Sequence, residues 1–341
     1  MKKVIALSLV MVLVFFTAAC TRQTQGSGPD QERHAAIFKA TGNPYFERMY
    51  SGFTDAMIEQ GYDIIHRSPA NPTAEAQIQM IDQLIAQRVA SIGIAANDPD
   101  ALQPALTRAR QAGIKVYSFD SAVNAASRDV HVEQADVQMI GETLVEAAWD
   151  LAGGSGEIAI LSATSQATNQ NAWIAVMEET LRSNSKYANL NLVTIAYGDD
   201  LRDKSTSETQ GLIASFPNLK VIVAPTTVGI AAAAKVVADQ GLIGRVKVTG
   251  LGLPSEMAEY IENDACPYMF LWNPIDLGYL GGYVAVALSN GTITGKVGDR
   301  LNAGKLGSYQ VTEAADGGTQ VLLGPPFKFE KSNISSWKSV Y

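Results

Sequence analysis

Residues 91–119 read SIGIAANDPDALQPALTRARQAGIKVYSF, and this stretch decides the fold. Residues 91–95 form a short apolar run, and residues 100–112 have the spacing of an amphipathic helix that ends at Gly113. A second apolar run, residues 115–119, follows at once. A strand, a helix and a strand in this order predict two parallel strands joined by a crossover helix.

The same alternation extends along the chain in both directions. Before residue 91 it predicts strands at 34–39 and 62–66 and helices at 45–60 and 73–87. After residue 119 it predicts helices at 137–151, 169–184, 205–215 and 228–240 and strands at 157–161, 191–197, 221–224 and 246–250. Two similar α/β units indicate two lobes, each a doubly wound parallel sheet flanked by helices.

Composition excludes several classes of protein. The 341 residues are 47% hydrophobic and 18% charged, which provides ample material for packed cores and excludes a disordered chain. The net charge of −8 argues against nucleic acid or an anionic membrane surface as a partner. The 2 cysteines cannot form a disulfide framework. Cys266 lies in an apolar stretch and is expected to be buried and inert.

The N-terminus is typical of a secretion signal. Residues 1–19 combine two lysines with an apolar run that is too short to span a membrane, and small residues precede Cys20. This pattern resembles a bacterial lipobox, in which the Cys20 thiol is linked to diacylglycerol, although Thr17 stands where the motif usually has leucine. The alternative is an ordinary cleaved signal. Residues 20–33 are predicted to be a polar tether, so the mature protein is expected to be held outside the cytoplasm by its lipid alone.

Polar and aromatic side chains gather directly after the predicted strands, where ligands bind in such sheets. They lie in the segments 39–46 (KATGNPYF), 119–121 (FDS), 162–173 (SATSQATNQNAW), 225–227 (PTT), 251–254 (LGLP) and 271–274 (LWNP). Neutral hydrogen-bonding groups, one acid, one base and several flat rings are what a sugar or polyol requires. A nucleotide is not indicated, because the chain has no G-x-x-x-x-G-K-[ST] loop.

Six motifs spread along the chain carry a resemblance to a known family. They are residues 91–100 (SIGIAANDPD), 167–174 (ATNQNAWI), 198–205 (GDDLRDKS), 224–229 (APTTVG), 249–257 (TGLGLPSEM) and 272–279 (WNPIDLGY). With Asp120 after a KVYSF-type strand, they resemble type 1 periplasmic sugar-binding proteins of ABC importers. The likeness is closest to the rhamnose-binding members and to the related receptors for the furanosyl autoinducer.

The resemblance implies a two-lobed α/β fold in which the chain crosses between the lobes three times. Lobe one is then expected over 34–132 and 274–322, and lobe two over 133–273 and 323–341. The three crossings form a hinge that lets the lobes close on a ligand. The resemblance also implies an ABC permease and its ATPase as partners of a monomeric protein. A lipoprotein sensor that reports to a chemoreceptor has the same binding chemistry and remains an alternative.

Asp120 is the central residue of the predicted site, because it follows a strand and can accept hydrogen bonds from ligand hydroxyls. Hydroxyl contacts are also predicted from Asn169, Gln170, Asn171, Thr227 and Asn273. Apolar walls are predicted from Phe46, Trp173 and Trp272, and supporting positions from Asn43, Thr226 and Leu253. Lys39 is predicted either to contact a ligand oxygen or to pair with Asp120. Trp173 could instead belong to the core of its own helix.

L-Rhamnose or a close 6-deoxyhexose is the predicted ligand. The autoinducer receptors have acidic residues in two motifs where this chain has Asn169 and Thr226, which favours rhamnose. Lys39 and Asp120 are shared with those receptors, so the autoinducer stays as the second candidate, beside other small polyols. A methyl group on the sugar requires an apolar niche, for which Leu253, Phe46 and Trp272 are available.

Two other classes of protein are disfavoured. Sugar-responsive repressors share this core but carry a DNA-binding helix-turn-helix before it, for which the chain ahead of residue 35 has no counterpart. His34, His66 and His131 lack metal-ligand spacing, and no G-x-S-x-G elbow is present, so neither catalysis nor a metal or other cofactor is expected. The acidic run at 199–203 suggests either a cation site or, more simply, a solvated loop that caps a helix.

Overall fold

The computed structural model describes residues 32–341. The predicted signal peptide at 1–19, the lipid attachment at Cys20 and the tether up to residue 31 lie outside the described residues. Arg33, predicted to end the tether, instead begins strand β1. Within residues 32–341 no helix is long and apolar enough to cross a membrane.

The first sheet has seven strands. In spatial order they are β13 (Thr312–Glu313), β14 (Thr319–Leu322), β5 (Val130–Glu133), β4 (Lys115–Phe119), β3 (Ser91–Ile94), β1 (Arg33–Ile37) and β2 (Asp63–Arg67). All neighbours are parallel except β13 and β14. The sheet starts with β1. The next strand, β2, pairs on one side of β1, and β3, β4 and β5 follow on the other side, so the strand order reverses between β1 and β3. Ligands bind beyond the carboxyl ends of the strands at such a reversal.

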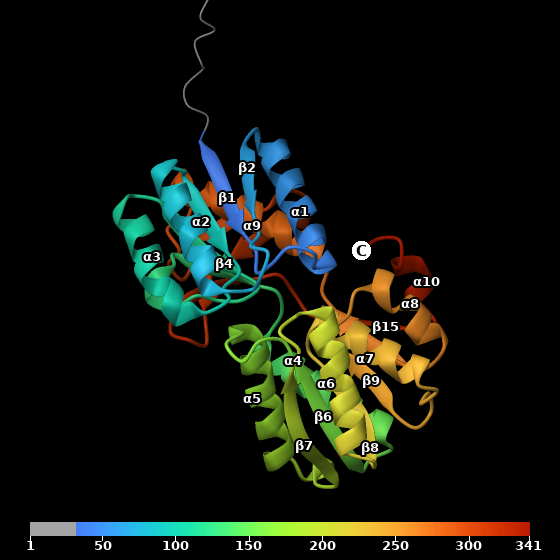
Figure 1. The fold of residues 1–341 in the computed structure, drawn as a ribbon. Helices are drawn as coiled ribbons and strands as arrows, with labels where there is room; N and C mark the ends of the chain where they lie inside the picture. The colour runs from blue at the N-terminus through green and yellow to red at the C-terminus, as the bar shows by residue number, and fades with distance from the viewer. Residues whose placement is uncertain (1–31) are drawn as a thin grey trace, which may run out of the picture. The chain divides into compact units, whose positions relative to one another are not determined.

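Helices cover both faces of this sheet, and we call the assembly the first lobe. Its helices are α1 (Pro44–Gln60), α2 (Ala74–Ala86), α3 (Pro99–Gln111) and α9 (Pro274–Ser289). Alternation along β1 divides the core, because Ala35 and Ile37 pack in one apolar cluster and Ala36 packs in the other. Figure 1 shows α9 running beside α1 although the two helices are far apart in the sequence.

Two glycines allow α1 and α9 to approach closely. A Cβ atom on Gly278 would lie 1.9 Å from the backbone oxygen of Met49, and one on Gly52 would lie 1.8 Å from that of Ile275. Only hydrogen fits at these two positions. The return of the chain to the first lobe in α9 therefore depends on these glycines.

The second sheet has four parallel strands, and with its helices it forms what we call the second lobe. The strands, in spatial order, are β7 (Leu190–Tyr197), β6 (Gly156–Ser162), β8 (Leu219–Ala224) and β9 (Lys247–Gly250). The helices are α4 (Val137–Ala152), α5 (Thr168–Ser183), α6 (Arg202–Ser215), α7 (Thr227–Asp239) and α8 (Pro254–Glu262). Beside this sheet, β10 (Tyr268–Leu271) pairs with β15 (Phe327–Glu330) in antiparallel fashion.

The strands and helices predicted up to residue 250 are all present, with ends that agree within a few residues. Their caps explain the agreement: the side chains of Asn43, Thr73 and Asp98 accept backbone N–H bonds at the starts of α1, α2 and α3. The later elements lie outside the predicted alternation. They are α8, β10, α9, β11 (Arg300–Asn302), β12 (Ser308–Gln310), β13, β14, β15 and α10 (Ile334–Trp337), together with the earlier strand β5.

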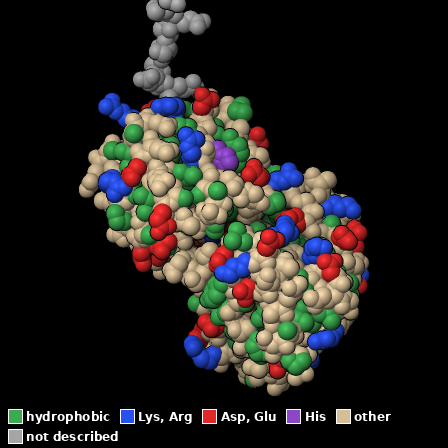
Figure 2. Space-filling view, viewed as in Figure 1, with side chains coloured by type: hydrophobic (Ala, Val, Ile, Leu, Met, Phe, Trp, Pro, Cys, Tyr) green, Lys and Arg blue, Asp and Glu red, His purple; other side chains and the backbone are tan. Residues whose placement is uncertain are grey.

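Charge is evenly distributed over the visible surface. Figure 2 shows acidic and basic side chains intermixed on the viewed face, without a large patch of either sign. A surface of this kind does not attract a polyanion.

Candidate ligand-binding site

A pocket lies at the carboxyl ends of strands from both lobes. Its lining residues are Lys39, Asn43, Tyr45, Phe46, Asp120, Asn169, Gln170, Trp173, Asp200, Pro225, Thr226, Thr227, Leu251, Leu271 and Trp272. The space between them, counted out to the mouth, is about 340 Å³. The loops after β1, β4, β7, β8, β9 and β10 all contribute, as expected for a doubly wound fold.

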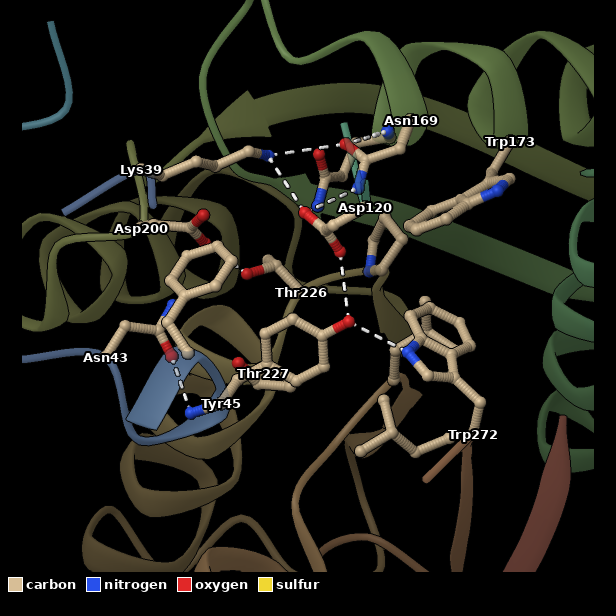
Figure 3. A pocket seen from close by; sticks show the side chains of 15 residues that line it. Lys39, Asn43, Tyr45, Asp120, Asn169, Trp173, Asp200, Thr226, Thr227 and Trp272 are labelled. Atoms are coloured by element: carbon tan, nitrogen blue, oxygen red, sulfur yellow. Dashed lines mark hydrogen bonds and ion pairs between the residues drawn. The ribbon is translucent and has the colours of Figure 1, made fainter. Parts of the chain in front are cut away.

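Asp120 lies at the centre of this pocket and is 4% exposed. Figure 3 shows its carboxylate between Tyr45, Asn169 and Lys39. The Tyr45 hydroxyl donates to Asp120 Oδ1 at 3.0 Å, and Asn169 Nδ2 donates to Oδ2 at 3.4 Å. Lys39 Nζ lies 3.8 Å from Oδ2. A carboxylate can accept about four hydrogen bonds, so capacity remains for ligand hydroxyls.

The backbone of the pocket is strained at two aspartates. Asp120 has φ 60° and Asp200 has φ 53°, which places both in the left-handed region that residues other than glycine, asparagine and aspartate seldom adopt. Such conformations persist where the surrounding structure imposes them, and they concentrate at functional sites. In both cases the turn directs a carboxylate into the pocket at the end of a strand.

Burial controls the protonation of the central groups. It raises the pKa of Asp120, while the nearby Lys39 ammonium and the Tyr45 hydroxyl oppose the rise. Burial, together with the negative charge of Asp120, also raises the pKa of Tyr45 well above its ordinary value. The Tyr45 phenol therefore stays protonated and donates to Asp120 at neutral pH.

Asn169 joins the two lobes. It belongs to α5 of the second lobe, yet its Oδ1 accepts from Ser121 Oγ at 2.7 Å and from Lys39 Nζ at 3.4 Å, both in the first lobe. The backbone N–H of Gln170 also donates to this oxygen, at 3.0 Å. Gln170 Oε1 is buried and has no hydrogen-bond partner among residues 32–341, so it can accept from a ligand.

Aromatic rings close one side of the pocket. Trp272 Nε1 donates to the Tyr45 hydroxyl at 2.8 Å, and the two rings meet edge to face with centroids 6.3 Å apart. Trp173 is 5.8 Å from Trp272, centroid to centroid, and Phe46 packs against Tyr45. Trp173 is 1% exposed and so belongs to the core of its lobe while also lining the pocket.

The structure brings together most of the predicted site residues. Those that line the pocket are Lys39, Asn43, Phe46, Asp120, Asn169, Gln170, Trp173, Thr226, Thr227 and Trp272. Three others do not line it. Asn171 is one residue beyond Gln170 on α5, hence about 100° further round the helix, and it donates to the Ser165 carbonyl. Asn273 caps α9 by accepting from the backbone of Ile275, and Leu253 is fully buried in the core.

Five lining residues lie outside the predicted set: Tyr45, Asp200, Pro225, Leu251 and Leu271. Tyr45 had a usable signal, because it lies in the loop-to-helix segment after β1. Leu251 follows β9 and Leu271 ends β10, and in the sequence both resemble ordinary core residues. Asp200 was interpreted as part of a capping loop or a cation site, but its carboxylate accepts a hydrogen bond from Thr226.

The described part of the chain shows no cluster of three or more potential metal ligands. In the acidic run, Asp199 pairs with Lys204 instead. Cys266 is buried and free, as expected, and burial raises the pKa of its thiol.

Comparisons with known proteins place this geometry in a family. The periplasmic binding protein domain model matches residues 35–293, so the chain belongs to that family. A crystal structure of an ABC transporter solute-binding protein from Clostridium phytofermentas, with bound L-rhamnose, is 51% identical, with a TM-score of 0.89 and coverage of 91% of this chain and 99% of that chain. The predicted type 1 fold is thereby confirmed, and the chain is a binding protein and not an enzyme.

The chain is also similar to more distant proteins. The LsrB protein of Clostridium saccharobutylicum, in complex with AI-2, is 23% identical, with a TM-score of 0.84 and coverage of 89% of this chain and 99% of that one. The D-ribose/D-allose-binding protein of Pseudomonas aeruginosa is 24% identical over 234 residues, which are 65% of this chain and 71% of that protein.

Proposed function

We propose that this protein captures L-rhamnose, or a close 6-deoxyhexose, outside the cytoplasm and delivers it to an ABC permease and its ATPase. The observation that carries the proposal is the 51% identity, over 91% of the chain, to a solute-binding protein that holds L-rhamnose. The pocket agrees in its chemistry, because it offers neutral amides and hydroxyls around a central ion pair, with Asp200 as a further carboxylate that accepts from Thr226.

Each part of the sugar finds a matching group in the pocket. Asp120 and Lys39 are proposed to bind adjacent hydroxyls as acceptor and donor, and Asn169 and Gln170 to add amide contacts from the second lobe. Phe46, Trp173 and Trp272 are proposed to pack against the C–H faces of the ring. Because Leu253 lies in the core, the niche for the methyl group is assigned to Leu251 and Leu271, which line the pocket.

Capture is proposed to proceed by closure of the two lobes. The chain crosses between them after β5, between β10 and α9, and between β14 and β15. These crossings support a boundary with 34–132 and 274–322 in lobe one and 133–273 and 323–341 in lobe two. Three short connections can bend without disturbing either sheet. Asn169, which contacts both lobes, is placed to stabilise the closed form.

Lipid attachment at Cys20 is proposed as the anchor that keeps the protein near its permease, as a monomer. Replacement of Cys20 by alanine is expected to release the protein into the soluble fraction and to abolish labelling by a radioactive fatty acid. Persistent membrane association of the variant would exclude the anchor without touching the binding proposal.

Isothermal titration of the purified protein tests the ligand. Rhamnose, fucose, ribose, erythritol and the furanosyl autoinducer form the panel. Micromolar or tighter binding of rhamnose, with weaker binding of the others, is the expected result. Tight binding of the autoinducer without heat from rhamnose would replace rhamnose by the second candidate and leave the fold and family unchanged.

A further inference from the structure

A second cavity adjoins the pocket described above. The space between its lining residues, counted out to the mouth, is about 1030 Å³, against about 340 Å³ for the pocket. Both lobes line it, through the loop after β4, the start of α5 and the turn between β13 and β14. Asp120 and Asn169 line both spaces and therefore form the partition between them.

The walls of the second cavity combine polar and charged side chains with eight small apolar ones. The apolar ones are Pro99, Ala122, Val123, Ala125, Val137, Ala172, Ala314 and Ala315. Short side chains from several elements leave room that larger residues would fill. The walls suit the C–H face of a second sugar ring or of another uncharged group.

Charged groups at one end of the cavity are paired and yet retain hydrogen-bonding capacity. Arg128 pairs with Asp316 at 2.8 Å, and His131 Nε2 lies 3.4 Å from Glu133 Oε2. Arg128 Nε and Glu133 Oε1 are nevertheless buried and have no hydrogen-bond partner among the residues described. One donor and one acceptor thus lack a partner beside a lining that is acidic, with Asp120 and Asp136 as further carboxylates. An anionic group is disfavoured there, whereas hydroxyl groups can serve both the donor and the acceptor.

The partition includes two long contacts on the side of the pocket, beside the 2.7 Å bond from Ser121 to Asn169. The Asn169 Nδ2 to Asp120 Oδ2 distance and the Lys39 Nζ to Asn169 Oδ1 distance are both 3.4 Å, at the long end of hydrogen bonding. An ether or hydroxyl oxygen between these side chains can accept from Asn169 Nδ2 or Lys39 Nζ, while Asp120 keeps the Tyr45 hydroxyl as a donor. The two spaces can therefore be joined by one linking oxygen.

We propose that the second cavity is a further compartment of the binding site, and that it accepts the group attached to a rhamnose unit. The ligand class is then an uncharged rhamnoside, such as a rhamnosyl disaccharide, as well as the free sugar. This inference rests on the proposed function, since the rhamnose unit occupies the first pocket.

The test fills the second cavity and leaves the first pocket intact. Ala172→Phe projects a ring into the cavity from α5, and Ala175→Phe, on an exposed position of the same helix, is the matched control. Calorimetric titrations with L-rhamnose and with a rhamnosyl-glucose disaccharide are run on all variants. Should Ala172→Phe not fold by circular dichroism, Ala315→Phe on the exposed turn between β13 and β14 serves the same purpose.

The wild-type protein is expected to bind the disaccharide at least as tightly as rhamnose. Ala172→Phe should weaken the disaccharide by about tenfold or more, because overpacking excludes the second ring, and should leave rhamnose within about twofold. Ala175→Phe should change neither. The second compartment would be wrong if the wild-type protein did not bind the disaccharide. It would also be wrong if Ala172→Phe left the affinity for the disaccharide unchanged, or lowered the affinities for the disaccharide and for rhamnose equally. If the wild-type protein did not bind rhamnose, the proposed function would be wrong instead.

Discussion

The two lobes contribute different chemistry to the same pocket. The first lobe supplies the central ion pair, Lys39 and Asp120, and holds the carboxylate with Tyr45. The second lobe supplies neutral groups, of which Asn169 and Gln170 are the most central, and one carboxylate, Asp200, that accepts from Thr226. A buried charge needs fixed partners before the ligand arrives, whereas amides exchange partners readily. We therefore expect the first lobe to hold its half of the site fixed and the second lobe to adapt on closure.

The largest expected effect tests the close approach of α1 and α9 in the first lobe against an open helix position in the second. Gly278→Ala would place a Cβ atom 1.9 Å from a backbone oxygen of α1, so we expect a loss of about 3 kcal/mol in the free energy of unfolding. Gly211→Ala, on α6 of the second lobe, meets nothing within 4 Å and should stabilise by about 0.5–1 kcal/mol through helix propensity. Urea unfolding of both variants measures the difference. Equal effects would remove the contrast in packing.

Acid should destabilise the first lobe before the second. The fully buried His34 pairs with Ser91 at 2.8 Å in the first sheet, and burial lowers its pKa to about 4, against 6.5 for the free side chain. The unfolded chain therefore binds the proton more readily, so stability is complete above about pH 7 and falls between pH 6.5 and 4. The total loss is about 3 kcal/mol.

Urea unfolding at pH 7.5 and pH 4.5 checks this acid sensitivity, with His34→Asn as the comparison. The variant should be less stable at pH 7.5 but should lose less on acidification. A pH dependence that matches the wild type would assign the acid sensitivity to other groups, such as His66 on β2, whose pKa burial also lowers.

The contrast between lobes also explains what the sequence could predict. Asp120 follows a strand and Asn169 lies in the first turn of a helix. At such positions the local sequence pattern indicates both the element and which of its ends faces a ligand. Leu251 and Leu271 could not be assigned to the pocket, because an apolar residue at a strand end looks the same in a core. The pairing of β10 with β15, and the return of α9 to α1, depend on contacts between distant segments that no local period reveals.

Among the variants that affect binding, removal of the Asp120 carboxylate in the first lobe should have the largest effect. Asp120→Ala deletes a buried, charge-assisted acceptor worth about 1.5–3 kcal/mol, so the dissociation constant for rhamnose should rise roughly tenfold to a hundredfold. Asp82→Ala, at an aspartate half exposed on α2 and remote from the pocket, is the control. Calorimetry measures both, with circular dichroism to verify the fold. An unchanged constant for Asp120→Ala would make this residue purely structural.

The smallest expected effect belongs to the second lobe. Asn169→Ala removes a neutral amide whose contacts to Lys39 and Asp120 are long, so a loss of about 0.5–1.5 kcal/mol is expected, which corresponds to roughly two- to tenfold weaker binding. Asn171→Ala, two residues along the same helix and outside the pocket, should have no effect.

The rate constants separate the two roles of Asn169. Because its side chain also receives the 2.7 Å bond from Ser121 across the lobes, the loss should appear mainly as faster dissociation of the sugar in stopped-flow fluorescence. Asp120→Ala, by contrast, removes an acceptor that stays with the first lobe in either arrangement. If Asn169→Ala weakened binding as much as Asp120→Ala, the second lobe would hold the ligand as firmly as the first. The division into a rigid and an adapting half would then be wrong.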